Sequence, residues 1–122
     1  MIHFKIKEQI YRIPLAISVG NWIDYSELLL KKYNVESGKQ IHFGGCCEWY
    51  KQDNFALASV WLPKFDYNEP YYIATLSHEI DHAVMFIFEL IDIPILDNQS
   101  NHAYIYLKEY FLTKALKKLK GA

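Results

Sequence analysis

The fold of this chain is constrained most by its longest mostly apolar run. It extends from Pro70 to Leu90 or Ile91, and its apolar residues occupy most faces of a helix drawn through it. Pro70 suits the first turn of a helix, because its missing N–H needs no partner there. The residues Asp92-Ile93-Pro94 end the segment. We therefore predict a central, largely buried helix against which the other elements pack.

Shorter patterned segments precede and follow this helix. Together they predict an α+β fold, a small and mostly antiparallel sheet packed on the central helix and a C-terminal helix, in one domain spanning residues 1–122. The expected elements are a strand at Ile10–Val19, a helix at Tyr25–Tyr33 capped by Asp24, strands at Ile41–Phe43, Cys46–Tyr50 and Phe55–Leu62, and a last helix at Ser100–Leu119.

Composition argues against several classes of partner. The formal net charge is −1, which disfavours phosphate-driven binding of nucleic acid. No segment reaches the ~18 apolar residues of a membrane span, and Met1 to Arg12 lacks the apolar middle of a signal peptide. The adjacent Cys46 and Cys47 indicate reduced thiols rather than a disulfide. We expect a cytoplasmic protein that binds neither nucleic acid nor membrane.

A metal-binding motif lies in the middle of the predicted central helix. His78 and His82 are four residues apart, which places both imidazoles on one helix face. That spacing lets two ring nitrogens reach one Zn²⁺ at about 2.0–2.1 Å. Glu79 follows the first histidine and completes an H-E-x-x-H arrangement. Zinc lowers the pKa of a bound water toward about 7, and Glu79 can accept the proton of that water as a general base and pass it to a leaving nitrogen.

A hydrolytic zinc site needs a third protein ligand besides the two histidines. A histidine six residues after His82 would be one solution, but Phe88 occupies that position. We favour His102, in the predicted first turn of the last helix, over its alternative role as a surface or capping histidine. Asp97 is the second choice, since a carboxylate also suits zinc.

The segment His78-Glu79-Ile80-Asp81-His82, followed about twenty residues later by His102, resembles the zincin metallopeptidases of the gluzincin type. The small size and the run from His102 to Leu107 are most similar to short zincin-like metallopeptidases encoded by bacteriophages and prophages. The likeness covers roughly Phe55 to Leu119. One departure concerns the third ligand, because such proteins commonly have Glu where this chain has His102.

The resemblance implies a small peptidase with Zn²⁺ held by His78, His82 and a third ligand, and with Glu79 as the general base. It also implies that the strand Phe55–Leu62 is an edge strand that pairs with an extended peptide substrate, and that the protein acts in the cytoplasm of a bacterial host if a phage encodes it. Two alternatives remain open: a zincin-like module that binds a host or phage protein without turnover, and a hydrolase of a small amide or ester. The oligomeric state is not determined.

Other residues near the motif have both a functional and a structural interpretation. Asp81 either orients an imidazole or is an exposed helix acid. Aromatic side chains before the motif either line a substrate groove or pack in the core, and tyrosines of the last helix either stabilise an oxyanion or pack. These aromatic residues are Trp49, Tyr50, Trp61, Tyr71 and Tyr72 before the motif, and Tyr104, Tyr106 and Tyr110 after it.

Overall fold

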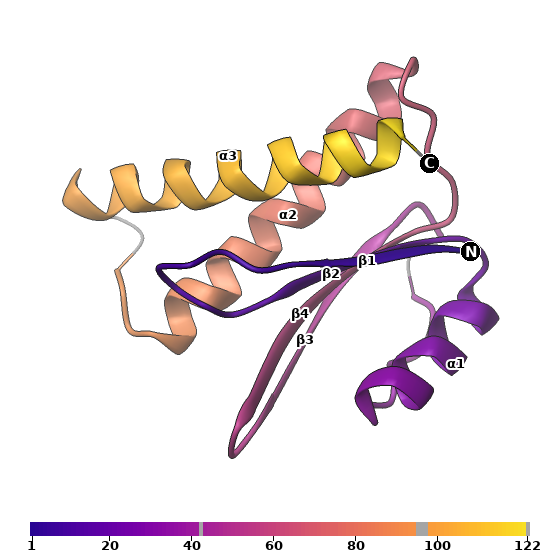
Figure 1. Ribbon diagram of the computed structural model, residues 1–122, viewed down its shortest axis with the longest axis horizontal. Helices are drawn as coiled ribbons and strands as arrows, with labels where there is room; N and C mark the ends of the chain where they lie inside the picture. Colours follow the sequence, from indigo (N-terminus) through magenta and orange to yellow (C-terminus); the bar gives the residue numbers. More distant parts are fainter. Residues whose placement is uncertain (42, 95–97, 122) are drawn as a thin grey trace.

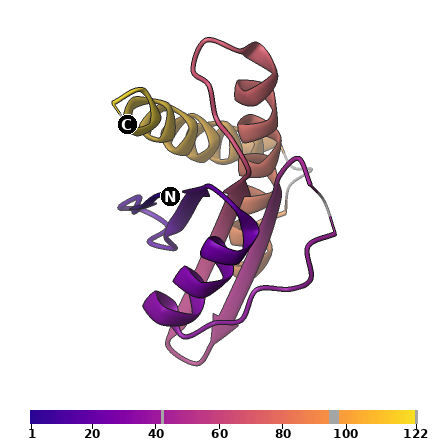
Figure 2. The same cartoon turned by 90° about the vertical axis from the view of Figure 1, so that its right-hand side faces the viewer.

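A four-stranded sheet separates one short helix from two long ones (Figure 1). The fold is taken from a computed structural model, which describes residues 1–41, 43–94 and 98–121. Along the chain the elements are β1 (Ile2–Ile6), β2 (Leu15–Val19), α1 (Trp22–Tyr33), β3 (Cys46–Gln52), β4 (Phe55–Leu62), α2 (Pro70–Leu90) and α3 (Asn98–Lys120). Figure 2 shows α1 on one face of the sheet, with α2 and α3 on the other. The expected α+β class is confirmed.

The sheet is mixed and has the order β1-β2-β4-β3. β4 pairs antiparallel with β3 and parallel with β2, whose Leu15–Val19 lie opposite Ala58–Leu62. β4 is therefore an interior strand, and the expectation that Phe55–Leu62 is an edge strand open to a peptide is wrong. Its backbone is paired on both sides along 58–62, so no further strand can add there. The edge strand on this side of the sheet is β3.

β4 is buried because both of its faces are covered. Ala58, Val60 and Leu62 face α2 and α3 in the larger core. Trp61, on the opposite face, packs with Tyr25 and Leu29 of α1. A strand covered on both faces carries apolar side chains without alternation, which explains the continuous pattern that marked this segment in the sequence.

α2 has the bounds expected from the sequence, with Pro70 at its start. It is less completely buried than expected. Its core-facing stripe includes Leu76, Ile80 and Ile87, which have no exposed surface. The opposite stripe, with Tyr71, His78, His82, Met85 and Glu89, is exposed. Helix α2 is thus amphipathic around the motif, and both histidines lie on its solvent side.

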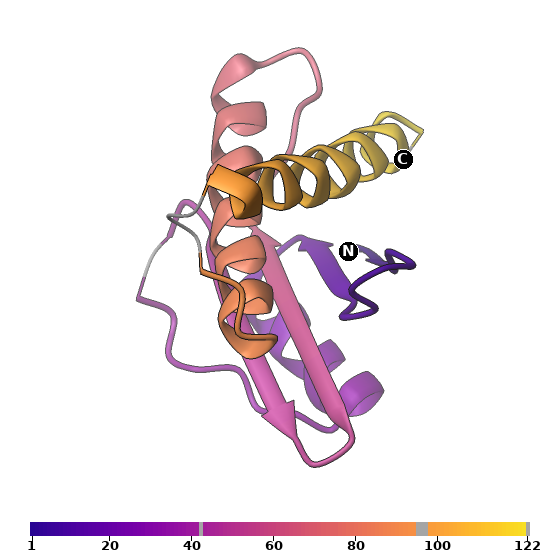
Figure 3. The ribbon, with the colours of Figure 1, turned by 90° about the vertical axis from the view of Figure 1, so that its left-hand side faces the viewer.

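α3 crosses α2 (Figure 3), and two polar contacts join the helices. Tyr104 donates a hydrogen bond of 2.6 Å to Asp81 Oδ1, and Lys108 Nζ lies 2.8 Å from Asp81 Oδ2. Leu107 and Phe111 of α3 are fully buried in the larger core beside these contacts. Both carboxylate oxygens of Asp81 are thus engaged by α3.

The N-terminal half differs most from the sequence expectations. β1 was not expected, and only Leu15–Val19 of the expected strand Ile10–Val19 is a strand. The described residues of Ile41–Phe43, which are 41 and 43, form no strand. Helix α1 begins three residues early, because the Asn21 side chain caps it by accepting a hydrogen bond from the Asp24 N–H. Among the described residues, no helix is long and apolar enough to cross a membrane.

Candidate metal centre

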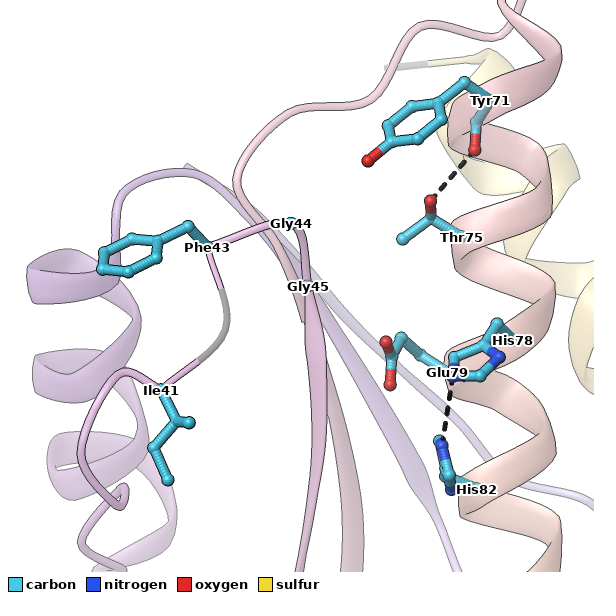
Figure 4. Close-up of a pocket in the computed structure, with 9 residues that line it drawn as sticks. All are labelled: Ile41, Phe43, Gly44, Gly45, Tyr71, Thr75, His78, Glu79 and His82. Carbon is cyan, nitrogen blue, oxygen red and sulfur yellow. Dashed lines mark hydrogen bonds between the residues drawn. The ribbon is translucent and has the colours of Figure 1, made fainter.

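The two histidines of the motif bring their ring nitrogens close together on one face of α2 (Figure 4). His78 Nε2 and His82 Nε2 lie 3.2 Å apart, with the rings nearly perpendicular at 83°. Two Zn–N bonds of about 2.0–2.1 Å at a tetrahedral angle place their nitrogens about 3.3 Å apart. The separation of the two nitrogens therefore fits a shared zinc ion, and the exposure of both rings leaves room for further ligands.

Glu79 joins this pair from the buried side of the helix. Ligand atoms of His78, Glu79 and His82 all lie within 4.8 Å of one another. The Glu79 side chain is only 8% exposed, and in Figure 4 its carboxylate points from α2 into the pocket beside the histidines. A carboxylate placed one residue after a ligand, and rotated about 100° from it around the helix, can reach a group held by the two imidazoles. This His-Glu-His cluster is a possible metal-binding triad.

The triad opens into a pocket of about 450 Å³. Its far wall is the segment before β3, which Figure 4 shows facing α2. The lining residues are Ile41, Phe43, Gly44, Gly45, Tyr71, Thr75, His78, Glu79 and His82. Sequence reasoning did not assign this wall to the site. The Gly44-Gly45 pair was its only signal, and it was interpreted as a break between strands.

Gly45 lets this wall approach α2 closely. Its φ is +145°, a backbone conformation that residues other than glycine rarely adopt. A Cβ here would lie 3.0 Å from Leu62 Cδ2 and 3.3 Å from Thr75 Cγ2. The start of the same segment is held by Glu48 of β3, whose Oε2 accepts the Gly38 N–H at 2.6 Å. The wall of the pocket is therefore attached to the sheet at both of its ends.

The thiols of β3 are not suited to metal binding or nucleophilic attack. Burial, together with the Glu48 and Glu79 carboxylates, raises the pKa of Cys46 to about 12. Burial and the charge of Glu79 also raise the pKa of Cys47 far above its usual range. Both cysteines are free thiols, as expected, and both stay protonated at neutral pH.

The residues expected to supply the third ligand are not brought to the triad by the described part of the structure. His102 lies near the start of α3 with an exposed side chain, and it does not belong to the cluster around His78. Its assignment as a ligand stays a prediction. Asp97 lies outside the described residues.

Asp81 and the tyrosines of α3 have structural partners instead. Asp81 accepts from Tyr104 and pairs with Lys108, so it is neither an exposed helix acid nor directed at His82. Tyr106 donates to Glu8 Oε2 at 2.6 Å, and Tyr110 donates to the Lys7 carbonyl. None of the three tyrosines lines the pocket of the triad.

The aromatic residues before and at the start of α2 divide between core and groove. Trp61 is buried, and Tyr50 donates a hydrogen bond to Glu48 on the α1 side of the sheet. Tyr71 lines the pocket of the triad, and Tyr72 packs against its ring. Trp49 is exposed beside the C-terminal half of α2.

Comparisons with known proteins give no further identification. No family model matches the chain, and neither a curated protein nor a solved structure matches it. The function must therefore be inferred from the geometry of the triad.

Proposed function

We propose that this chain is a zinc-dependent hydrolase that cleaves a peptide, with His78 and His82 as zinc ligands and Glu79 as the general base. The observation that carries the proposal is the 3.2 Å separation of the two Nε2 atoms beside a buried glutamate. Two imidazoles that share a face, and a carboxylate turned from it, match the roles that zinc hydrolysis requires.

Zinc, when bound, would supply a Lewis acid that polarises both the attacking water and the scissile carbonyl. Glu79 would accept the proton lost in the attack and return it to the leaving nitrogen, so the carboxylate ends each cycle as it began. Its burial restricts the side chain, and an ion held by the two histidines would lie within its reach. The open pocket beside the triad gives a substrate access from solvent.

A peptide is the substrate that the sheet favours. β3 is an edge strand, and its first residues follow directly on Gly44 and Gly45 of the pocket wall. An extended peptide that adds to a strand edge gains main-chain hydrogen bonds independently of its sequence. We therefore transfer the expected peptide-binding role from Phe55–Leu62 to Cys46–Gln52. A small amide or ester would use the same zinc chemistry but would not need this edge.

The test compares metal content and cleavage in matched variants. Glu79→Gln is expected to retain zinc and lose peptide cleavage by about 10³-fold or more, since it removes the base and keeps the side-chain shape. Glu27→Gln is the control, because Glu27 is an exposed glutamate of α1 on the far face of the sheet. Cleavage that survives Glu79→Gln would remove Glu79 from the chemistry.

A binding module without turnover is the second candidate. Among the described residues, the triad contains two imidazoles and no third, and the pocket rim carries the exposed apolar side chains of Ile41, Phe43 and Tyr71. Zinc-loaded protein that cleaves no member of a broad peptide library, yet binds one protein partner with a defined stoichiometry, would favour this candidate.

A further inference from the structure

We propose that the recess beside Trp49 is a specificity subsite, which binds an apolar or aromatic side chain two or three residues from the cleaved bond. The inference rests on the proposed peptidase function and names the side chain that the enzyme would select. It concerns a second cavity, which is separate from the pocket of the triad and lies farther along α2 and beside β3.

Trp49 offers an apolar surface at the edge of the sheet. Residues 47, 49 and 51 of β3 share the face toward α2: Cys47 packs in the core on that side, and Trp49 stacks on Phe86. The two rings are 5.7 Å apart with an angle of 17°. One face of the indole is thereby covered, yet 54% of Trp49 stays exposed. An indole fixed in this way offers a rigid apolar surface that costs little entropy on binding.

The recess next to this indole has a volume of about 360 Å³. The exposed indole of Trp49 lies there beside two side chains of opposite charge; the lining residues are Trp49, Lys51, Phe86, Glu89 and Leu90. A charged side chain of either sign would meet one like and one opposite charge, so the recess selects neither sign. An uncharged apolar side chain would gain by covering the exposed face of the indole, and we expect this class to be favoured.

The distance between the recess and the triad sets the position of this side chain. Phe86 follows His82 by one helical turn, or about 6 Å along the axis, and Glu89 follows it by about 10 Å. An extended peptide advances about 3.3 Å per residue. A bond cleaved at the two histidines would therefore place the side chain two or three residues away over Trp49. The edge of β3 would hold the peptide in the extended form that this spacing requires.

Cleavage profiling of a peptide library by zinc-loaded wild type and Trp49 variants tests the inference. We expect the wild type to prefer Phe, Leu, Tyr or Trp at one position two or three residues from the cleaved bond. Trp49→Ala should lower kcat/KM for such peptides by roughly 10-fold or more, mainly through KM. Peptides with Ala at that position should be cleaved equally by both proteins. Trp49→Phe should keep the preference, because it retains an aromatic surface on Phe86.

Ile105→Ala is the matched control, since Ile105 is an exposed apolar residue of α3 outside both cavities. It should leave the cleavage profile unchanged. Every variant should have the same zinc content as the wild type. A wild-type profile without this preference, or a preference that persists in Trp49→Ala, would overturn the subsite while leaving the peptidase function in place. Zinc-loaded wild type that cleaves no peptide would overturn the proposed function and the subsite together.

Discussion

At the scale of single residues, burial separates the roles within the motif. His78 and His82 are exposed, so their nitrogens can bind an ion and still leave positions for water and substrate. Glu79 is buried between the helix and β3, where its charge contributes to the raised pKa of both neighbouring cysteines. One helical turn thus presents two imidazoles to solvent and holds a carboxylate in a restricted environment.

A third histidine gives the fold a dependence on pH. His3 is half-buried, with Nδ1 2.9 Å from Ser18 Oγ and Nε2 2.8 Å from Tyr33 Oη. Burial, together with the nearby charges of Lys32 and Lys5, lowers the pKa of His3 to about 4. In the unfolded chain the imidazole titrates near pH 6.5. Protonation therefore favours the unfolded chain as the pH falls below about 6.5, and the loss is complete below about 4.

We accordingly expect His3→Gln to reduce the pH dependence of stability. Because His3 is partly solvated, its contribution to the free energy of unfolding should change by only about 1 kcal/mol between pH 7 and pH 4. Urea unfolding of the metal-free wild type and variant at both pH values measures this difference. Equal losses of stability in the two proteins would show that His3 does not cause it.

At the scale of elements, the helices were easier to predict from sequence than the sheet. The bounds of α2 follow from Pro70 and from Asp92-Ile93-Pro94, which are local signals. β1 was missed although its sequence carries a local signal, since Ile2, Phe4 and Ile6 alternate with His3 and Lys5 at the period of a strand. The continuous apolar run of Phe55–Leu62 indicates a strand with two covered faces, but its position inside the sheet depends on pairing with β2, a distant segment.

The candidate site was also only partly predictable from the sequence. The triad is contained in one helical turn, so the spacing of His78 and His82 was sufficient to predict it. The pocket wall comes from the segment before β3, and its approach to α2 depends on the φ of Gly45. The face of Asp81 was ambiguous, because the packing of α3 on α2 decides whether that acid meets solvent or Tyr104.

The contact between α2 and α3 predicts a change in stability without a change in metal binding. Tyr104→Phe removes a hydrogen bond to a carboxylate and should lower the free energy of unfolding by about 1–2 kcal/mol. Zinc affinity should stay within about 2-fold of the wild type, because Asp81 is held by α3 and not directed at the histidines. Chemical unfolding and zinc titration measure the two quantities. A large fall in zinc affinity would instead make Asp81 a residue that orients an imidazole.

The pocket wall provides a second prediction at this scale, with its control in the next residue. Gly45→Ala should lower the free energy of unfolding by about 1–3 kcal/mol, because alanine is strained at φ +145° and its Cβ would meet Leu62 and Thr75. Gly44→Ala should have little effect, since its nearest neighbour would be Tyr71 Oη at 3.6 Å. Thermal unfolding of both variants measures the difference, and equal stabilities would contradict this account of the turn.

At the scale of the whole molecule, the two histidines of the candidate metal centre lie outside the cores that hold the fold together. The larger core contains the sheet face, α2 and α3, and the smaller one contains α1 with Trp61. The exposed stripe of α2 that carries His78 and His82 belongs to neither. The fold should therefore form without metal, in contrast to small domains whose folding depends on a structural zinc ion.

This separation predicts that zinc stabilises a chain that is already folded. In a chelator the protein should retain its helical circular dichroism and unfold cooperatively. With free zinc at about 100 times the dissociation constant, ligand linkage adds about 2.7 kcal/mol, which should raise Tm on the order of 10 °C. His78→Ala and His82→Ala should each abolish this rise, and metal analysis of His102→Ala decides whether that residue is the third ligand. Loss of helical structure in the chelator, or an unchanged rise in His78→Ala, would contradict a metal centre on the exposed face of α2.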